Sequence, residues 1–246
     1  MISFQSDATE PLLPLFVGIQ YRQIEMVECL LQKGASVTEI NSKGWVPLEY
    51  AIHIGCEKIV NLLLENGAKV EVEYTTCTVF CWTPLLLAAC LGSSNIVRLL
   101  LAKGANIEPT DSLQPTPLYM AVSQGNKDVV ELLLQRGSSV DPIYRGKTPL
   151  FLAAELGHAG IIMLLLRSGA YIEVQDEMGE TPLSTAISHG HKNAVDILLD
   201  SGANCRVIYT FGLNPLSRIT EKGHENIAKL LIEKGNWPPG FIEALV

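Results

Sequence analysis

Residues 148–170 read TPLFLAAELGHAGIIMLLLRSGA, and this stretch decides the fold of the chain. It holds two short apolar segments at helical spacing, separated at Gly157 and ended at Gly169. Threonine followed by proline favours a helix start, because threonine can cap the first turn and proline lacks only an N–H that this turn does not use. A glycine after each segment favours a helix end. The stretch therefore predicts two helices joined by a turn.

The same unit recurs along nearly the whole sequence. Prolines occur at positions 14, 47, 84, 117, 149, 182 and 215. Each of them lies 20 residues before a glycine, at positions 34, 67, 104, 137, 169, 202 and 235. All variation in length falls between a glycine and the next proline, which marks that segment as the loop. Because two residue types keep one register over seven copies, we predict a tandem repeat in which each unit packs only on its neighbours.

The repeated unit resembles the ankyrin repeat. The Thr-Pro-Leu-His-x-Ala motif of that family occurs, with other residues in place of the histidine, at 83–88, 116–121, 148–153 and 181–186. The Gly-His turn of the family occurs at 157–158, 190–191 and 223–224. The resemblance covers about residues 10–236. It implies an all-α ankyrin-repeat solenoid of stacked antiparallel helix pairs, with β-hairpin-like fingers between the pairs.

The repeat spacing predicts three segments. We expect an N-terminal tail at 1–10, a repeat domain at 11–236 and a C-terminal cap or tail at 237–246, for which a linear motif that binds a partner is the alternative. The seven repeats are expected at about 11–35, 44–68, 81–105, 114–138, 146–170, 179–203 and 212–236. Apolar residues on the outer side of the first copy (Val17, Ile19 and Ile24) leave open that the chain comes from a larger protein, such as a multidomain regulator or a pathogen effector.

Composition and charge narrow the function classes. The chain has 246 residues and a formal net charge of -8, which argues against binding of a nucleic-acid backbone. No apolar run approaches the roughly 18 residues that span a bilayer, and the first residues do not resemble a signal peptide. The six cysteines form no even framework, and Cys29, at the place of Leu62 in the next copy, is predicted to be a buried thiol. We expect a soluble, cytoplasmic protein that is a monomer by itself.

The resemblance also implies where a partner would bind, because partners of this family lie on the concave face and the finger tips. Four kinds of position are expected on that surface. They are the residue before the conserved alanine, the two residues after the pair that begins with this alanine, the histidine place of the motif, and the aromatic residues of the fingers. The predicted partner-binding residues are Tyr50, His53, Tyr74, Phe80, Trp82, Leu87, Cys90, Tyr119, Met120, Gln124, Tyr144, Leu152, Glu155, Leu156, Thr185, His189 and Arg218.

The leading interpretation is a non-catalytic protein–protein interaction scaffold whose groove of copies two to five contacts a partner, because copies two to four present mostly apolar groups at these positions. One alternative is a small-molecule-binding protein or an unconventional enzyme that uses the apolar groove of repeats 2–5 as a pocket. Another is that Tyr50, Tyr119 and Phe151 simply pack against neighbouring repeats while the fingers fold down on them.

Signals of catalysis or metal binding are weak. Gly146-Lys147-Thr148 resembles the end of a phosphate loop, but Asp141 stands where that loop needs glycine. Cys77 and Cys81 lack the second Cys/His pair of a zinc site.

His189, Ser188, Glu155 and Glu221 form the one polar cluster expected on the groove, and acid–base chemistry there would need convergent geometry. The histidines of the Gly-His turns are expected to be structural. Acidic finger residues, among them Glu71, Asp176 and Glu180, are interpreted as a solvated edge. We therefore predict no catalytic residue, no metal and no cofactor.

Overall fold

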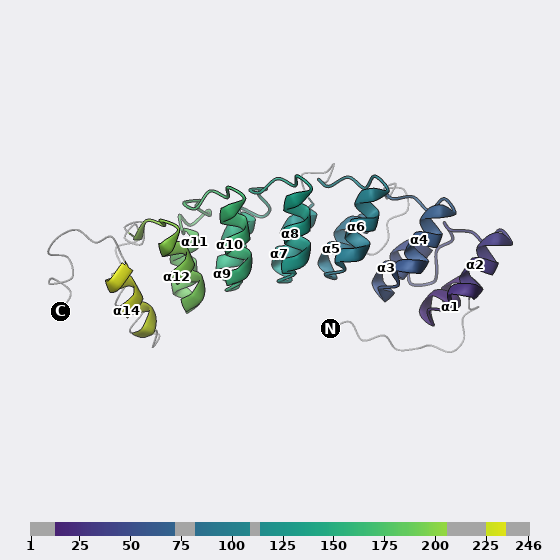
Figure 1. Ribbon diagram of the computed structural model, residues 1–246, viewed down its shortest axis with the longest axis horizontal. Coiled ribbons are helices and arrows are strands. Elements are labelled where there is room, and N and C mark those ends of the chain that lie inside the picture. The colour runs from purple at the N-terminus through teal and green to yellow at the C-terminus, as the bar shows by residue number, and fades with distance from the viewer. Residues whose placement is uncertain (1–12, 72–81, 109–113, 206–224, 235–246) are drawn as a thin grey trace. The chain divides into compact units, whose positions relative to one another are not determined.

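The computed structural model describes residues 13–71, 82–108, 114–205 and 225–234 (Figure 1). The first helices of the repeats are α1 (Pro14–Gln20), α3 (Pro47–Ile54), α5 (Pro84–Cys90), α7 (Pro117–Ser123), α9 (Pro149–Glu155) and α11 (Pro182–Ser188). The second helices are α2 (Ile24–Gln32), α4 (Glu57–Glu65), α6 (Ser94–Ala102), α8 (Lys127–Gln135), α10 (Ala159–Arg167), α12 (Lys192–Asp200) and α14 (Glu225–Lys234). The predicted all-α repeat architecture is confirmed. The first helix begins at Pro14, the first proline of the repeat series.

The chain divides into two compact units, residues 1–106 and 107–246. In the first unit, α1, α3 and α5 pack on one another in one row and α2, α4 and α6 in a second row. In the second unit, α7, α9 and α11 form one row and α8, α10, α12 and α14 the other. Within each unit the two helices of a repeat also pack together, so the apolar side chains meet between the rows. Ile52 and Leu63 in the first unit and Leu118, Leu133 and Leu165 in the second are fully buried.

The predicted threonine caps are present. The hydroxyl oxygens of Thr83, Thr116 and Thr148 accept hydrogen bonds from the backbone N–H three residues later, at 3.1, 3.1 and 3.3 Å. Thr181 accepts such a bond from Ser184 and donates its own N–H to the Ser184 hydroxyl, which completes a capping box. Each cap satisfies an N–H that the first turn leaves without a helical partner.

The predicted turn between the two helices of a repeat is also confirmed. Gly157 has φ 72°, in the left-handed region that favours glycine. Arg22 stands in the glycine place of the first repeat and adopts φ 53°, a conformation that costs free energy for a residue with a side chain. The Arg22 guanidinium donates a hydrogen bond of 2.6 Å to the backbone oxygen of Ile54 in the next repeat. This bond offsets part of the strain.

Two predictions about the first repeat are wrong. Cys29 is exposed, and Leu62 at the same place of the next repeat is only half-buried, because this position lies on the flank of the second helix rather than between the rows. Ile19 is fully buried and Val17 and Ile24 are half-buried. Ile19 therefore does not contribute to an apolar outer side.

Carboxylates at the finger bases link successive repeats. In each link the acceptor is an acidic residue four places after the final glycine of one repeat. The donor is the backbone N–H of the residue two places after the final glycine of the next repeat. The four pairs are Glu71 with Asn106, Glu108 with Ser139, Asp141 with Tyr171, and Glu173 with Asn204, at 2.7 to 2.9 Å. Solvation alone therefore does not account for Glu71, which is exposed but also accepts a hydrogen bond from the next repeat. No helix among the described residues is both long enough and apolar enough to cross a membrane.

Candidate functional site

An aromatic cluster covers the first-helix row of the first unit. The ring of Tyr50 on α3 lies 5.6 Å from Phe16 on α1 and 6.4 Å from Trp45 in the finger, and Trp45 lies 5.3 Å from His53. Burial raises the pKa of Tyr50, and the nearby Tyr21 raises it further. Of these residues only Phe16 is buried, so the cluster keeps part of its aromatic surface open. Trp45 is not among the predicted site residues.

The signal for Trp45 was its position. Trp45 lies two residues before the helix proline Pro47, and Trp82 lies at the same place before Pro84. Trp82 and Cys90 are both half-buried, whereas Leu87 is only 9% exposed. Burial raises the pKa of the Cys90 thiol, which favours the protonated form and disfavours nucleophilic chemistry.

Two tyrosines of the second unit pack on each other. Tyr119 on α7 lies 5.2 Å from Tyr144 of the following finger, in an edge-on arrangement, and is 8% exposed. Burial raises the pKa of Tyr119, with a further contribution from Glu155. Phe151 is 1% exposed. Tyr119 and Phe151 are both buried within the stacked repeats. For these two residues the alternative interpretation, in which the rings simply pack against neighbouring repeats, is therefore the better one.

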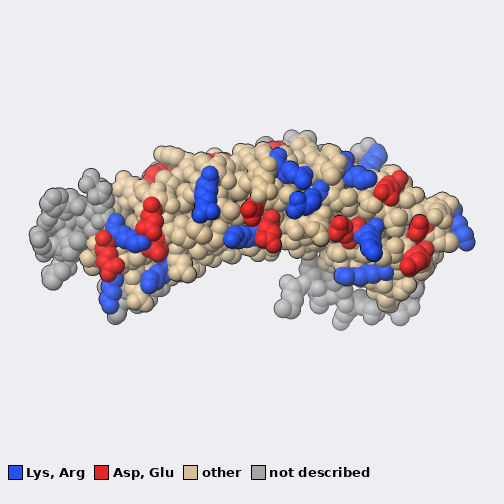
Figure 2. Space-filling model, in the orientation of Figure 1, with Lys and Arg blue, Asp and Glu red and all other residues tan. Residues whose placement is uncertain are grey.

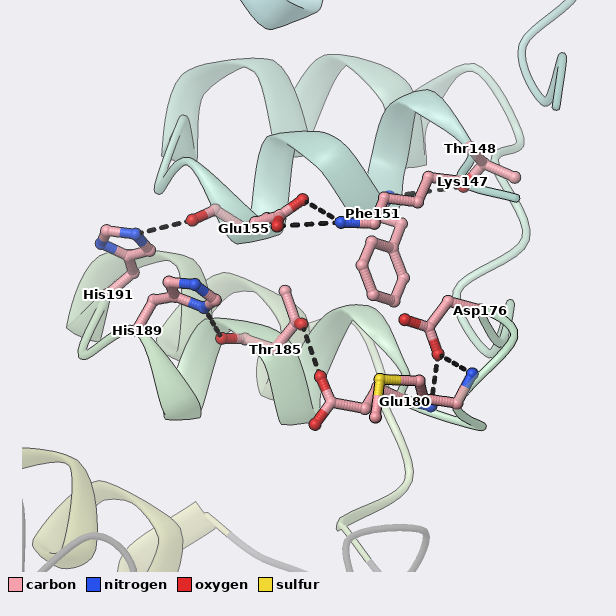
Figure 3. Close-up of polar contacts among 10 residues, drawn as sticks. Lys147, Thr148, Phe151, Glu155, Asp176, Glu180, Thr185, His189 and His191 are labelled. Atoms are coloured by element: carbon pink, nitrogen blue, oxygen red, sulfur yellow. Dashed lines mark hydrogen bonds and ion pairs between the residues drawn. The ribbon is translucent and has the colours of Figure 1, made fainter. Parts of the chain in front are cut away.

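An ion pair lies along the face of α9. Lys147 Nζ lies 2.7 Å from Glu155 Oε2 and 5.3 Å from the centre of the Phe151 ring (Figure 3). Both partners are about one third exposed, so solvent screens the pair and its contribution to stability is below about 1 kcal/mol. The Lys147 ammonium is thus bound to a carboxylate.

In the predicted acid–base cluster, Glu155 and His189 each bind another group, while Glu221 lies outside the described residues. The Glu155 carboxylate binds Lys147, and His189 Nδ1 lies 2.9 Å from the backbone oxygen of Thr185 (Figure 3). His191 Nε2 lies 2.9 Å from the backbone oxygen of Glu155, in the preceding repeat. His191 is therefore structural, as predicted for the Gly-His turns, while His224 lies outside the described residues.

The finger before α11 is held by its own acidic residues. Asp176 Oδ1 accepts hydrogen bonds of 2.9 Å from the backbone N–H groups of Met178 and Glu180. Thr185 Oγ1 donates to Glu180 Oε2 at 3.0 Å and is 2% exposed as a residue. The prediction that Thr185 lies on a partner-binding surface is therefore corrected. Thr185 is buried and anchors the finger.

The predicted partner-binding residues that the structure describes fall into three groups by exposure. Gln124, Leu156 and His189 are exposed, and Tyr50, His53, Trp82, Cys90, Met120, Tyr144, Leu152 and Glu155 are half-buried. Leu87, Tyr119 and Thr185 are buried and offer little surface. Tyr74, Phe80 and Arg218 lie outside the described residues. Contact of the first two groups with a partner remains a prediction.

Two finger residues outside the predicted set are strongly exposed. Ile143 is 71% and Met178 70% exposed. A large apolar residue just before a Gly-containing turn, as in Ile-Tyr-Arg-Gly146 and Met-Gly179, was the available signal. Repeat periodicity hides it, because finger tips are the segment that varies between copies.

Charges on the visible face are mixed. Figure 2 shows Lys and Arg side chains interspersed with Asp and Glu over both units, without a continuous basic stripe on that face. Among the described residues no group of three or more His, Cys, Asp or Glu side chains is arranged to hold a metal ion. The described contacts use polar side chains mainly to join turns, fingers and repeats.

Comparison with known proteins agrees with the repeat architecture. The family model described as "Ankyrin repeats (3 copies)" matches residues 3–74, 72–144 and 139–209. The crystal structure of the human ASB11 ankyrin repeat domain is similar with a TM-score of 0.77 and 26% identity, covering 92% of this chain and 99% of that one. The ankyrin repeat domain of Bcl-3, described as a unique member of the IkappaB protein family, has a TM-score of 0.72 and 25% identity, with 91% and 100% covered.

A curated relative matches over a shorter stretch. Ankyrin repeat and SAM domain-containing protein 3 of Homo sapiens is 41% identical over 61 residues, which is 24% of this chain. The matched stretch spans 9% of the length of that relative.

Proposed function

The chain belongs to the ankyrin repeat family, and from this premise we propose that it is a non-catalytic scaffold that binds a protein partner through its first-helix face and its fingers. Ankyrin repeat domains are generally protein–protein interaction modules. The similar structures match nearly the whole chain, so the proposal concerns a repeat domain as a binding surface.

One observation carries the proposal. Apolar side chains stay partly open on the first helices, while Glu155 and His189 of the predicted acid–base cluster form structural bonds. Met120 and Leu152 are half-buried on neighbouring first helices, whereas Lys147 and Glu155 bind each other. Partly open apolar groups rimmed by polar ones are expected at an interaction site.

Cellular location and assembly belong to the same proposal. The net charge of -8 and the absence of an even cysteine framework support a monomeric protein in a reducing compartment such as the cytoplasm. A nucleic-acid backbone would be repelled by this charge.

Affinity capture from a lysate of the organism of origin, with quantitative mass spectrometry, tests the proposal. The double variant Met120→Ser/Leu152→Ser should lose most of a partner that the wild-type chain retains, since a few central apolar residues carry most of an interface's free energy. Met163→Ser is the matched control, because Met163 is 39% exposed on α10, in the other row. Equal recovery by the folded double variant, or no protein recovered above empty beads, would contradict the proposal.

A further inference from the structure

The most exposed large apolar side chains of the described chain lie at two neighbouring finger tips. They are Ile143 and Met178, at 71% and 70% exposed. By comparison, Leu156 on the first-helix row is 41% exposed. In the second unit the two most exposed large apolar side chains therefore lie on the fingers rather than on the helices.

Both tips are held by hydrogen bonds within their own turns. The backbone N–H of Tyr144 donates to Lys147 and that of Lys147 to Tyr144, at 3.0 and 3.1 Å, around Arg145 (φ 52°) and Gly146 (φ 73°). Positive φ at both central residues is the geometry of a type I′ hairpin turn. In the next finger, the Asp176 carboxylate holds the N–H of Met178. Ordered tips reduce the entropy that a partner must remove on binding.

The two fingers lie side by side. The N–H of Tyr171 donates to Asp141 Oδ2 at 2.9 Å, and a Cβ placed on Gly146 would lie 3.1 Å from Glu177 Oε1. Residues 138–147 and 171–180 thus form one continuous surface, which we call the finger edge.

The finger edge carries negative charge beside its apolar tips. It holds the five carboxylates of Asp141, Glu173, Asp176, Glu177 and Glu180 against two basic groups, those of Arg145 and Lys147, a net charge of -3. Lys147 is neutralised by Glu155 outside the edge, and Arg145 lies over the ring of Tyr144 at 5.3 Å. A partner of complementary charge would bring lysine or arginine side chains.

We propose that the finger edge binds a protein segment in which a large aliphatic or aromatic residue is flanked by lysine or arginine. The apolar residue packs against Ile143 and Met178, and the basic residues lie next to Glu177 and its neighbouring carboxylates. Anionic membranes and nucleic acids carry the same sign of charge as this edge and do not fit it. The inference rests on the proposed scaffold function and names the class of partner that this part of the surface accepts.

Selection of a random-peptide phage library on the full chain tests the proposal. Enriched peptides should combine at least two basic residues with a large apolar one. A synthetic peptide of the most enriched sequence should bind at least about tenfold more weakly to Met178→Ser and to Glu177→Lys, as expected for residues central to an interface. Raising the ionic strength should weaken binding as well.

Two control variants separate the edge from general effects. Met163→Ser removes an exposed methionine from α10, and Glu131→Lys makes the same charge reversal at an exposed site on α8. Both should bind the peptide as the wild type does. Circular dichroism confirms that every variant is folded.

The outcomes distinguish this inference from the function on which it rests. Enriched peptides without basic residues, or binding that only Met120→Ser/Leu152→Ser weakens, would overturn the finger-edge proposal and leave the scaffold function standing. A library that yields no binder overturns the inference too, and the lysate capture then decides the scaffold function by itself.

Discussion

His191 Nε2 lies 2.9 Å from the backbone oxygen of Glu155, so the turn histidine of one repeat is bonded to the end of the first helix of the repeat before it. The same ring covers Gly157, where an added Cβ would lie 2.6 Å from its Nδ1. A residue that the repeat pattern marks only as part of a turn therefore joins two repeats.

Replacing His191 tests this link. His191→Ala should lower the free energy of unfolding by about 1–3 kcal/mol, since a half-buried carbonyl loses its partner and packing on Gly157 is lost. His189→Ala is the control: that ring is exposed, stacks on the His191 ring at 6.0 Å, and among the described residues bonds only to the oxygen of Thr185 within its own repeat. Its cost should stay within about 0.5 kcal/mol. Urea unfolding followed by circular dichroism measures both, and equal losses would contradict the inter-repeat role.

Acid should weaken the second unit through His158. Burial lowers the pKa of His158 from its ordinary value of 6.5, and the neighbouring His191 lowers it further. A group whose folded-state pKa is depressed binds protons more tightly when unfolded. Its contribution to stability is fully present above pH 6.5 and is lost as the pH falls through the folded-state pKa.

The measurement is the urea midpoint at a series of pH values from neutral to mildly acidic. His158→Gln should show a smaller fall in midpoint than the wild type below the ordinary histidine pKa, because the variant has no ring to protonate. An NMR titration of the His158 ring gives its pKa directly. A pKa of His158 above the ordinary value of 6.5 in the NMR titration would refute the prediction. Parallel curves of urea midpoint against pH for the two proteins would refute it as well.

The helices could be predicted from the sequence because residues within each repeat determine where its helices begin and end. The caps Thr116 and Thr148 and the stop Gly169 act on bonds within a few residues, so local pattern is sufficient. Side-chain burial on the first-helix row was harder to predict. Tyr119 is buried by Tyr144, and Thr185 by its finger, and both depend on how a loop folds back over a helix.

The carboxylate links show a signal that was present and misread. Glu71, Glu108, Asp141 and Glu173 keep the same intervals as the prolines, yet acidic residues in loops are usually explained by solubility. Their periodicity was the reason to expect a structural role. Finger tips such as Ile143 and Met178 have no such periodicity, so their exposure required the three-dimensional structure.

Removing one carboxylate link should loosen the repeat that follows it. Glu108 Oε1 accepts from the N–H of Ser139 at 2.8 Å and from the Ser138 hydroxyl at 3.0 Å. Glu108→Ala should cost about 1–2 kcal/mol, in the range of charge-assisted hydrogen bonds, and should speed hydrogen exchange at the Ser139 amide. Glu131→Ala, on the exposed side of α8, is the control and should leave that amide unchanged. Unaltered exchange in Glu108→Ala would show that the link contributes nothing.

Alanine substitutions at two glycines distinguish the free-energy cost of backbone strain from the cost of a steric clash. Gly157 and Gly169 have φ 72° and 90°, so alanine at either place is strained and costs about 1–2 kcal/mol. At Gly169 the added Cβ meets open space, whereas at Gly157 it would lie 2.6 Å from His191 Nδ1. Gly157→Ala should therefore cost at least about 1 kcal/mol more than Gly169→Ala, because the ring must move and its bond to Glu155 weakens. In a His191→Ala background the same Gly157→Ala change should cost no more than Gly169→Ala, since the clash disappears with the ring. Urea unfolding of Gly157→Ala, Gly169→Ala, His191→Ala and the Gly157→Ala/His191→Ala double variant measures each cost, and an excess that persists in the His191→Ala background would place its cause in the backbone instead.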